Sequence, residues 1–353
     1  MLWAVIMAGG SGTRFWPESR KNKPKQFLKI FGHKTLLEQT ADRVRPLIDR
    51  RRILVVTQAS NVPLVVKLLK IPASQVIGEP VGRNTAPCAA LAAAVALRRD
   101  PEAVLAILPS DHRIDDESAY RKALRAALEE ARARKMPVTF GIRPAYPHTG
   151  FGYLEFGRRS GSRNRFAVHV LKRFCEKPGL ARARSFVRAG RYYWNSGMFV
   201  WRADELLRAT REHQPKIHDL AVKIASGELK AGMKKWFSRM PSVSIDYGLM
   251  ERIREGILAI PGSFGWNDLG GWQVLPEMWT RDAQRNVVRG RAILIDSFDN
   301  IVKCDRRLVA LVGVRDQVVV DTPDALLVCH RNKTESVRHV VAALEKKKWK
   351  EFL

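Results

Sequence analysis

The sequence predicts an α/β fold, built on a Rossmann-like, mostly parallel sheet with helices on both faces. Over residues 1–142, short apolar and β-prone runs alternate with amphipathic stretches, which is typical of βαβ units. The first run, at 4–8, breaks directly into glycine, as a buried strand does when it enters a turn. Beyond residue 286, short strand-like runs recur and predict a small C-terminal β domain, a short β-solenoid or a sandwich, with a terminal helix.

Strands and helices can be placed along the first part of the chain. After 4–8, buried strands are expected at 52–57, 75–78, 103–108 and 137–142. Helices are expected at 36–47, at 62–70, from a cap at Asn84 or Thr85 to Arg99, and from about 118 to 134. Ligands bind beyond the carboxyl ends of the strands in such a sheet. The glycine turn, Glu79 and Asp111 are therefore expected at one edge of it.

After residue 147 the alternation of strand-like and helical segments gives way to short β segments. Short β segments at 150–156, 166–174 and 193–201 indicate an insertion or a mixed-sheet extension, a natural cover for a second substrate. Two helical stretches and a strand at 257–260 follow. The C-terminal runs lie at 292–295, 301–304, 308–312, 318–320 and 326–329, before a basic helix from about Thr334. We therefore predict two domains, residues 1–285 and 286–353.

Composition excludes several classes of protein. With 353 residues, 46% hydrophobic and 27% charged, the chain has a soluble globular composition. Its apolar runs stay short of the roughly 20 residues that a membrane-spanning helix needs, and no signal peptide is evident. The four cysteines are far apart and form no C-x-x-C pair, which argues against a zinc site or a disulfide framework. We expect a cytoplasmic protein without a membrane partner.

The formal net charge of +27 is unusual. It suits either a nucleic-acid-binding protein or a basic protein that handles anionic small molecules. Lysine and arginine are scattered over the whole length, are not interleaved with aromatic residues, and form no nucleic-acid-binding motif. A solvated basic surface without a specific nucleic-acid partner is therefore favoured.

The glycine turn carries the first chemical signal. Gly9, Gly10 and Gly12 allow the backbone to approach a ligand closely, and their N–H groups can form a concavity for an anion. Arg14 adds a permanently charged, planar fork. The spacing fits neither the P-loop nor the dinucleotide fingerprint, so an ordinary strand-to-helix turn is the alternative.

Nine motifs in order give this turn a context. They are GGSGTR (9–14), PK (24–25), EPVGRNTAP (79–87), PSDH (109–112), TGFGY (149–153), EKP (176–178), NSGMF (195–199), SIDYGLME (244–251) and GWND (265–268). Together they resemble the sugar-phosphate nucleotidyltransferases, and the RNTAP and SIDYGLME elements resemble the mannose-1-phosphate guanylyltransferases among them. The resemblance runs from Met1 to about Leu344.

The resemblance implies a reaction and its partners. Mannose 1-phosphate would attack the α-phosphorus of GTP and expel pyrophosphate, so that GDP-mannose forms. The triphosphate would be cradled by backbone N–H groups of Gly9, Gly10, Gly12 and Thr13. Arg14, Lys25 and Lys177 would be the catalytic cations, because two anions must meet and charge neutralisation dominates such chemistry.

The resemblance also assigns a metal pair and two recognition sites. Asp111 and Asp268 would hold Mg²⁺, a hard cation commonly bound by one or two carboxylates plus phosphates, although either aspartate could instead cap a turn or helix. Guanine would be recognised by Glu79, Arg83, Asn84 and Thr85, of which 83–85 could equally be a helix cap. The sugar phosphate would be bound by Gly152, Glu176, Lys177, Asn195 and Asp246. His112 is expected to be structural, because a phosphate nucleophile is already ionised.

Two rivals stay open from the sequence. A different sugar 1-phosphate is the close one, because sugar choice depends on pocket geometry. A non-catalytic regulator that binds nucleotide sugars is the other, although it has no need of Arg14, Lys25, Asp111 and Asp268 together. The chain has no extension like the isomerase domain of bifunctional relatives, so no isomerase activity is expected. A homodimer is left open.

Overall fold

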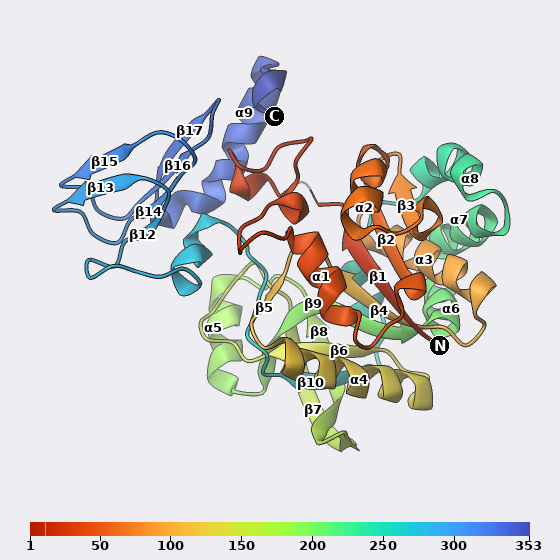
Figure 1. Ribbon diagram of the computed structural model, residues 1–353. Helices are drawn as coiled ribbons and strands as arrows, with labels where there is room; N and C mark the ends of the chain where they lie inside the picture. The colour runs from red at the N-terminus through yellow and green to blue at the C-terminus, as the bar shows by residue number, and fades with distance from the viewer. Residues whose placement is uncertain (11) are drawn as a thin grey trace. The chain divides into compact units, whose positions relative to one another are not determined.

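The computed structural model describes residues 1–10 and 12–353 (Figure 1). Ser11, a member of the glycine-rich run, lies outside the described residues. Contacts divide the chain into two units that interleave in sequence. The large unit comprises Met1–Gly9 and Glu38–Trp266, and the small unit comprises Gly10–Leu37 and Asn267–Leu353.

A mixed sheet forms the centre of the large unit. Among the described residues it has nine strands in the order β3-β2-β1-β4-β9-β6-β10-β8-β7. Strands β3, β2, β1 and β4 run parallel, as do β6 and β10, whereas β9 is antiparallel to both β4 and β6. The bounds are β1 Leu2–Ala8, β2 Ile53–Gln58, β3 Val76–Glu79, β4 Val104–Pro109, β6 Val138–Ile142, β7 Tyr153–Arg163, β8 Phe166–Cys175, β9 Tyr192–Arg202 and β10 Leu258–Gly262. The predicted α/β class is confirmed, and 147–201 extends the same sheet.

Helices cover both faces of this sheet, as predicted. Trp3 and Val5 of β1 belong to a buried cluster with α3, α6 and α7. Ala4 and Ile6 are buried too but point to the opposite face, because successive side chains of a strand alternate; α4 contacts strands β4, β6 and β10. The helices are α1 Leu36–Val44, α2 Val62–Leu69, α3 Thr85–Arg99, α4 Glu117–Arg134, α5 Leu180–Ala189, α6 Ala203–His213, α7 Pro215–Ser226 and α8 Leu229–Trp236. The short strands are β5 Arg113–Ile114 and β11 Trp266–Asn267.

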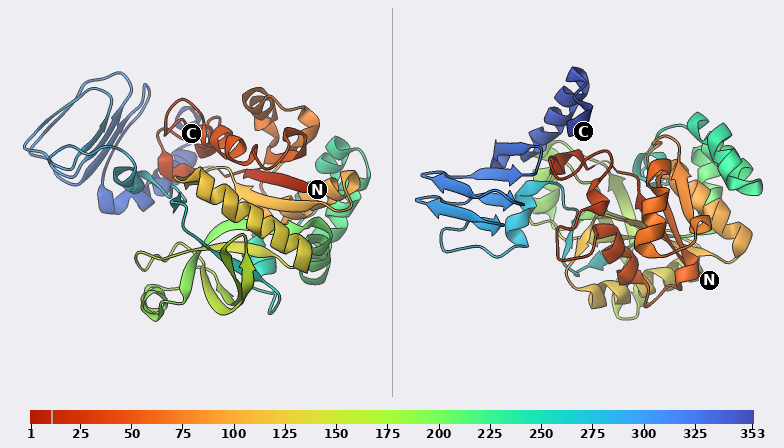
Figure 2. Two further views of the ribbon diagram at one scale, coloured as in Figure 1. Left: turned by 60° about the horizontal axis from the view of Figure 1, so that its bottom comes forward. Right: turned by 45° about the horizontal axis from the view of Figure 1, so that its top comes forward.

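The C-terminal part of the small unit is a short β-solenoid, which decides between the two predicted alternatives. Most of its strands pair in parallel with the strand of the next coil: Val287 pairs with Ile301, and Ile301 pairs with Val318. The last strand, at 326–330, pairs antiparallel with the strand at 317–321. The stacking is visible in the blue strands of Figure 2. The elements are β12 Val287–Arg289, β13 Ala292–Ile295, β14 Ile301–Cys304, β15 Val309–Val312, β16 Gln317–Asp321, β17 Leu326–His330 and the terminal helix α9 Val337–Lys347.

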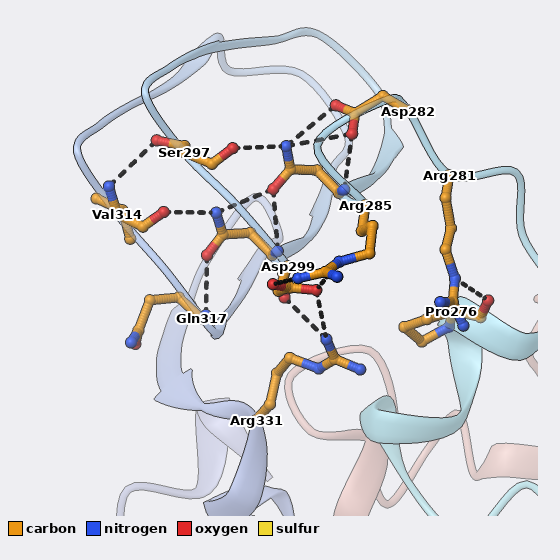
Figure 3. A network of polar contacts seen from close by, with 11 residues as sticks. Pro276, Arg281, Asp282, Arg285, Ser297, Asp299, Val314, Gln317 and Arg331 are labelled. Carbon is orange, nitrogen blue, oxygen red and sulfur yellow. Dashed lines mark hydrogen bonds and ion pairs between the residues drawn. The ribbon is translucent and has the colours of Figure 1, made fainter.

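Two buried asparagines, Asn286 and Asn300, hold successive coils in register. Their partners Ser297, Val314 and Gln317 are labelled in Figure 3. The Oδ1 atom of Asn286 accepts from the backbone N–H and the side-chain amide of Asn300, each at 3.0 Å. Asn300 in turn donates to the Val314 carbonyl and accepts from the Gln317 backbone. Because each buried amide finds partners on the next coil, a shift of register would leave polar groups unpaired.

The segment Gly10–Leu37 packs with the solenoid end of the chain. Phe15 and Trp16 belong to one buried cluster with Trp272, Val287 and Leu344. Trp272 donates its indole N–H to the Trp16 carbonyl, at 3.1 Å. The predicted boundary after residue 285 divides the sequence into two domains, whereas the two units are defined by contacts. This boundary stays a prediction. Over residues 1–10 and 12–353, no helix has the length and apolar character to cross a membrane.

Candidate active site

Glu79 and Gly9 lie side by side at the carboxyl edge of the large unit's sheet. Glu79 is the last residue of β3, and Gly9 directly follows β1. A Cβ atom on Gly9 would lie 2.9 Å from Oε2 of Glu79, so only glycine leaves this carboxylate its place. Glu79 is 4% exposed, and burial raises the pKa of its carboxyl. Glu79 therefore stands at the predicted edge.

The predicted guanine residues 83–85 form the start of α3. Asn84 adopts φ +64° and accepts from the Thr85 backbone N–H at 2.9 Å, and Thr85 Oγ1 accepts from the Ile245 N–H at 2.8 Å. The Arg83 guanidinium donates to the Ser238 carbonyl. These contacts are helix-capping and loop-tying contacts, so the cap foreseen as an alternative is present. Base recognition by 83–85 stays a prediction.

Asp111 follows β4 in the turn before β5, half-buried. The neighbouring His112 accepts the indole N–H of Trp266 at its Nδ1 atom, 3.1 Å away, and the two rings meet edge to face. An imidazole held in this way has one nitrogen engaged in a structural bond. This agrees with the expectation that His112 is structural.

All five residues predicted to bind the sugar phosphate are brought together. The Gly152 carbonyl accepts from the Asn195 backbone N–H at 2.8 Å, and the Asn195 side chain donates to Asp246 at 2.9 Å. A Cβ on Gly152 would lie 2.1 Å from Oε2 of Glu176, so glycine again makes room for a carboxylate. Lys177 Nζ lies 3.5 Å from Oε1 of Glu176. Four segments far apart in sequence thus meet at one place.

The carboxyl groups of this cluster are electrostatically unusual. Burial, and then the nearby Asp246 carboxylate, raise the pKa of Glu176 to about 7, while Lys177 acts in the opposite direction. Burial also raises the pKa of Asp246. Within the described part of the chain, the Glu176 Oε2 atom is buried without a hydrogen-bond partner. Such an acceptor suits a ligand that brings its own O–H donor.

In the small unit, Gly12 and Lys25 are in close contact. Gly12 has φ +63°, and a Cβ there would lie 2.2 Å from the Cβ of Lys25. Lys25 is 6% exposed and donates to the backbone carbonyl of Asp268 at 2.8 Å. The predicted catalytic lysine and the predicted metal ligand Asp268 are therefore neighbours. Thr13 begins the short 3-10 helix Thr13–Phe15 after the glycines.

Arg14, in the same 3-10 helix, is held by the C-terminal segment. Its Nε lies 2.9 Å from Oε2 of Glu335, with both side chains about half exposed. Its Nη1 donates a longer bond to the Gly270 carbonyl, at 3.4 Å. Thr334, beside Glu335, donates to Gln273 at 2.6 Å and fixes this segment.

The residues predicted to hold a metal are Asp111 and Asp268. Over the described ranges 1–10 and 12–353, no group of three or more histidine, cysteine or acidic side chains could hold a metal ion. Asp111 belongs to the large unit and Asp268 to the small unit. Isolated aspartates that share a cation with phosphates and water are nevertheless an ordinary arrangement for Mg²⁺.

Three polar residues near these sites were not found from the sequence. Cys88 contacts Glu79, Glu335 pairs with Arg14, and Glu251 accepts the Glu176 backbone N–H at 2.7 Å. Glu251 ends the SIDYGLME motif, so the motif carried a signal for it. For Cys88 and Glu335 the sequence contained no signal of a role at the site.

Comparisons with known proteins agree with this geometry. Residues 3–285 match the family described as nucleotidyl transferase, and residues 290–344 match the mannose-phosphate isomerase/GMP-like β-helix domain. The chain is 39% identical over 348 residues to the xanthan biosynthesis protein XanB of Xanthomonas campestris pv. campestris (strain B100), covering 97% of this chain and 73% of that one. It is 37% identical over 353 residues to a mannose-1-phosphate guanylyltransferase of Escherichia coli (strain K12), covering 98% and 73%.

A solved structure is similar along the whole chain. The crystal structure of a protein named mannose-1-phosphate geranyltransferase from Thermus thermophilus superposes with a TM-score of 0.88 at 35% identity. The match covers 98% of this chain and 99% of that one. Both units are therefore included in the similarity.

Proposed function

The chain belongs to the nucleotidyl transferase family, and from this premise we propose that it transfers GMP from GTP to mannose 1-phosphate, releasing pyrophosphate and forming GDP-mannose. The sugar-phosphate cluster carries this proposal. Gly152, Glu176, Lys177, Asn195 and Asp246 come from distant segments and form one contact chain with carboxylate acceptors and a cation. A sugar phosphate offers the O–H donors and the anion that such a chain would bind.

In this proposal, the glycine turn and the cations Arg14 and Lys25 bind the phosphates. An oxygen of mannose 1-phosphate forms a bond to the α-phosphorus while the bond from that phosphorus to the bridging oxygen of pyrophosphate breaks. Arg14 and Lys25 stabilise the charge that develops on the leaving phosphates, and backbone N–H groups of Gly9, Gly10, Gly12 and Thr13 bind the triphosphate. The nucleophile is already ionised near neutral pH, so no general base is needed.

Asp111 and Asp268 fit Mg²⁺ as hard oxygen donors, and we assign the metal to them. When bound, the ion neutralises phosphate charge. Asp111→Asn should abolish turnover while it barely weakens the binding of mannose 1-phosphate, measured by calorimetry. Unchanged turnover would remove Asp111 from the metal site.

Base and sugar are selected by buried carboxylates. Glu79 can accept from the N1–H and the exocyclic amine of guanine, and Glu176 and Asp246 from sugar hydroxyls. Lys177 would bind the sugar's phosphate.

All four cysteines are free thiols, which suits the reducing cytoplasm that we propose as the location.

The test is pyrophosphate release, with each nucleoside triphosphate crossed against mannose, glucose and fucose 1-phosphates, with and without Mg²⁺. We expect release from GTP with mannose 1-phosphate, and only with the metal. Release from ATP or UTP but not from GTP would overturn the base assignment. Preference for another sugar 1-phosphate would overturn the sugar assignment alone.

A further inference from the structure

The Glu79 carboxylate is held on more than one side inside the large unit. Its Oε2 atom lies against Gly9, where a Cβ would approach to 2.9 Å. Its Oε1 atom lies 3.0 Å from the Sγ atom of Cys88, one turn into α3. The Arg83 backbone N–H also bonds to the carboxylate and lowers its pKa against the effect of burial. Cys88 is 3% exposed, so water does not compete for this contact.

We infer that Cys88 is a positioning residue for base selection, whose S–H donates to Oε1 of Glu79 and fixes the plane of that carboxylate for guanine. The inference rests on the proposed function, because it takes Glu79 as the acceptor of the base. Cys88 itself touches no substrate. It acts by limiting the rotation of Glu79.

The direction of the hydrogen bond follows from the thiol's environment. Burial, and then the Glu79 carboxylate, raise the pKa of Cys88 well above its usual value, so the sulfur keeps its proton and is a donor. A second acceptor, the Asn84 carbonyl, lies 3.1 Å from Sγ. The single proton favours the ionised carboxylate, since charged acceptors form the stronger hydrogen bonds.

Orientation matters because guanine presents two parallel donors. A carboxylate that accepts both the N1–H and the exocyclic amine must lie in the plane of the base, and a rotation about the last torsion loses one of them. Sites that bind a polar group in this way reject analogues that lack it. Terminal carboxylate torsions are broad, so a buried donor at one oxygen narrows them.

The experiment compares Cys88→Ala and Cys88→Ser with GTP and with inosine triphosphate, which keeps the N1–H and lacks the amine. Alanine should lower kcat/KM for GTP about five- to tenfold, through KM, and should narrow the preference for GTP over inosine triphosphate. Serine keeps a donor and should stay within about twofold of the original protein. The KM for mannose 1-phosphate should not move. Cys304→Ala, which removes a buried thiol in the solenoid, is the matched control.

Two results would overturn the inference. One is an unchanged ratio of GTP to inosine triphosphate in Cys88→Ala, and the other is a Cys88→Ser protein that behaves like Cys88→Ala, since packing rather than donation would then be at work. Adding Cys88→Ala to Glu79→Gln should give less than the two separate effects combined, as expected for coupled residues. The original protein, assayed in parallel, separates the two proposals: if it uses GTP, a negative result concerns Cys88 alone; if it does not, the proposed function fails.

Discussion

Among the candidate site residues, carboxylates stand out in the large unit, beside Lys177, and the cations Arg14 and Lys25 stand out in the small unit, beside Asp268. In the large unit the prominent side chains are the carboxylates of Glu79, Glu176 and Asp246, whose pKa values are raised by burial. In the small unit they are cations: Lys25 donates to a backbone carbonyl, and Arg14 pairs with Glu335. The difference separates two tasks. In the proposed reaction, the carboxylates would accept from neutral N–H and O–H donors of a base and a sugar, whereas the cations would neutralise phosphates.

The two sets also differ in how well they are satisfied without ligand. The Glu176 Oε2 atom is buried with no partner among the described residues, so its ionised form is destabilised. The ammonium of Lys25 and the guanidinium of Arg14 each have an oxygen partner inside the small unit. The large unit should therefore gain more stability from ligand binding than the small one, and mutations should affect the two units differently.

Among the substitutions that test this comparison, the largest effect is expected at Lys25. Lys25→Met keeps the length and apolar stem of this buried side chain and removes its charge. A hydrogen bond to a charged group contributes about 1.5–3 kcal/mol, so kcat should fall by about one to two decades. Steady-state pyrophosphate release measures this. Lys29→Met changes an exposed lysine of the same segment and should leave kcat unchanged. A Lys25→Met protein that folds and keeps kcat within about threefold would contradict the proposal that Lys25 supplies a catalytic positive charge.

The next effect is a pH dependence of stability at Glu176. Its pKa is raised to about 7, so between about pH 4.5 and 7 the folded protein keeps a proton that the unfolded chain releases. Stability should therefore fall as the pH rises through this window, by an amount on the order of 2 kcal/mol. Glu176→Gln cannot ionise and should lack this fall. Urea unfolding at pH 5 and pH 8 compares the two proteins.

Glu155 offers the opposite control in the same unit. Glu155 is buried, and burial raises the pKa of its carboxyl, but hydrogen bonds with Tyr192 and Arg191 lower this pKa overall. Its carboxylate contributes stability that is lost as the pH falls through the lowered pKa. Glu155→Gln should lose stability at pH 8, where Glu176→Gln gains it. If both variants changed the stability at pH 8 in the same direction, the contrast between Glu155 and Glu176 would be wrong.

The fold was predictable where its signals are local. The alanine-rich helix expected to end at Arg99 is α3, Thr85–Arg99, and of the two expected caps Asn84 is the one present. The cap and the alanine run are adjacent in sequence, so this signal is local. The sequence did not show that β9 inserts between β4 and β6, since that pairing joins distant segments. It also left the solenoid and the sandwich undecided. Apolar runs alone do not tell whether a strand pairs parallel or antiparallel.

The candidate site was predictable only through motifs. The resemblance named Glu79, Arg14 and Glu176, and the family it pointed to is confirmed. The contacts that hold these side chains come from tertiary structure: Cys88 lies on the helix after Glu79, and Glu335 lies more than 300 residues from Arg14. No periodicity or spacing connects such pairs. The packing of Gly10–Leu37 with the C-terminal β domain was missed for the same reason.

The smallest effect is expected at Glu335, where the solenoid end of the chain reaches the catalytic arginine. Glu335 lies in the 3-10 helix Arg331–Ser336, whose first residue bonds to the Asp299 carbonyl of the solenoid at 3.1 Å (Figure 3). The Glu335 carboxylate pairs with the Nε of Arg14, and we expect it to orient the guanidinium of this proposed catalytic residue. Both side chains are about half exposed, and such pairs contribute about 0–1 kcal/mol. Glu335→Gln should therefore lower kcat about two- to fivefold with little change in KM.

The ionic strength and a second, similar ion pair serve as controls for this small effect. Added salt screens exposed ion pairs, so the difference between Glu335→Gln and the original protein should shrink as the ionic strength rises. Glu345 forms an ion pair of the same kind with Lys21, at 3.0 Å and similar exposure, in the same unit. Glu345→Gln should leave kcat unchanged, because Lys21 has no assigned role in the reaction. A lower KM for GTP in Glu335→Gln would mean that Glu335 competes with the phosphates for Arg14, and the small unit's cation would then be restrained rather than positioned by its partner.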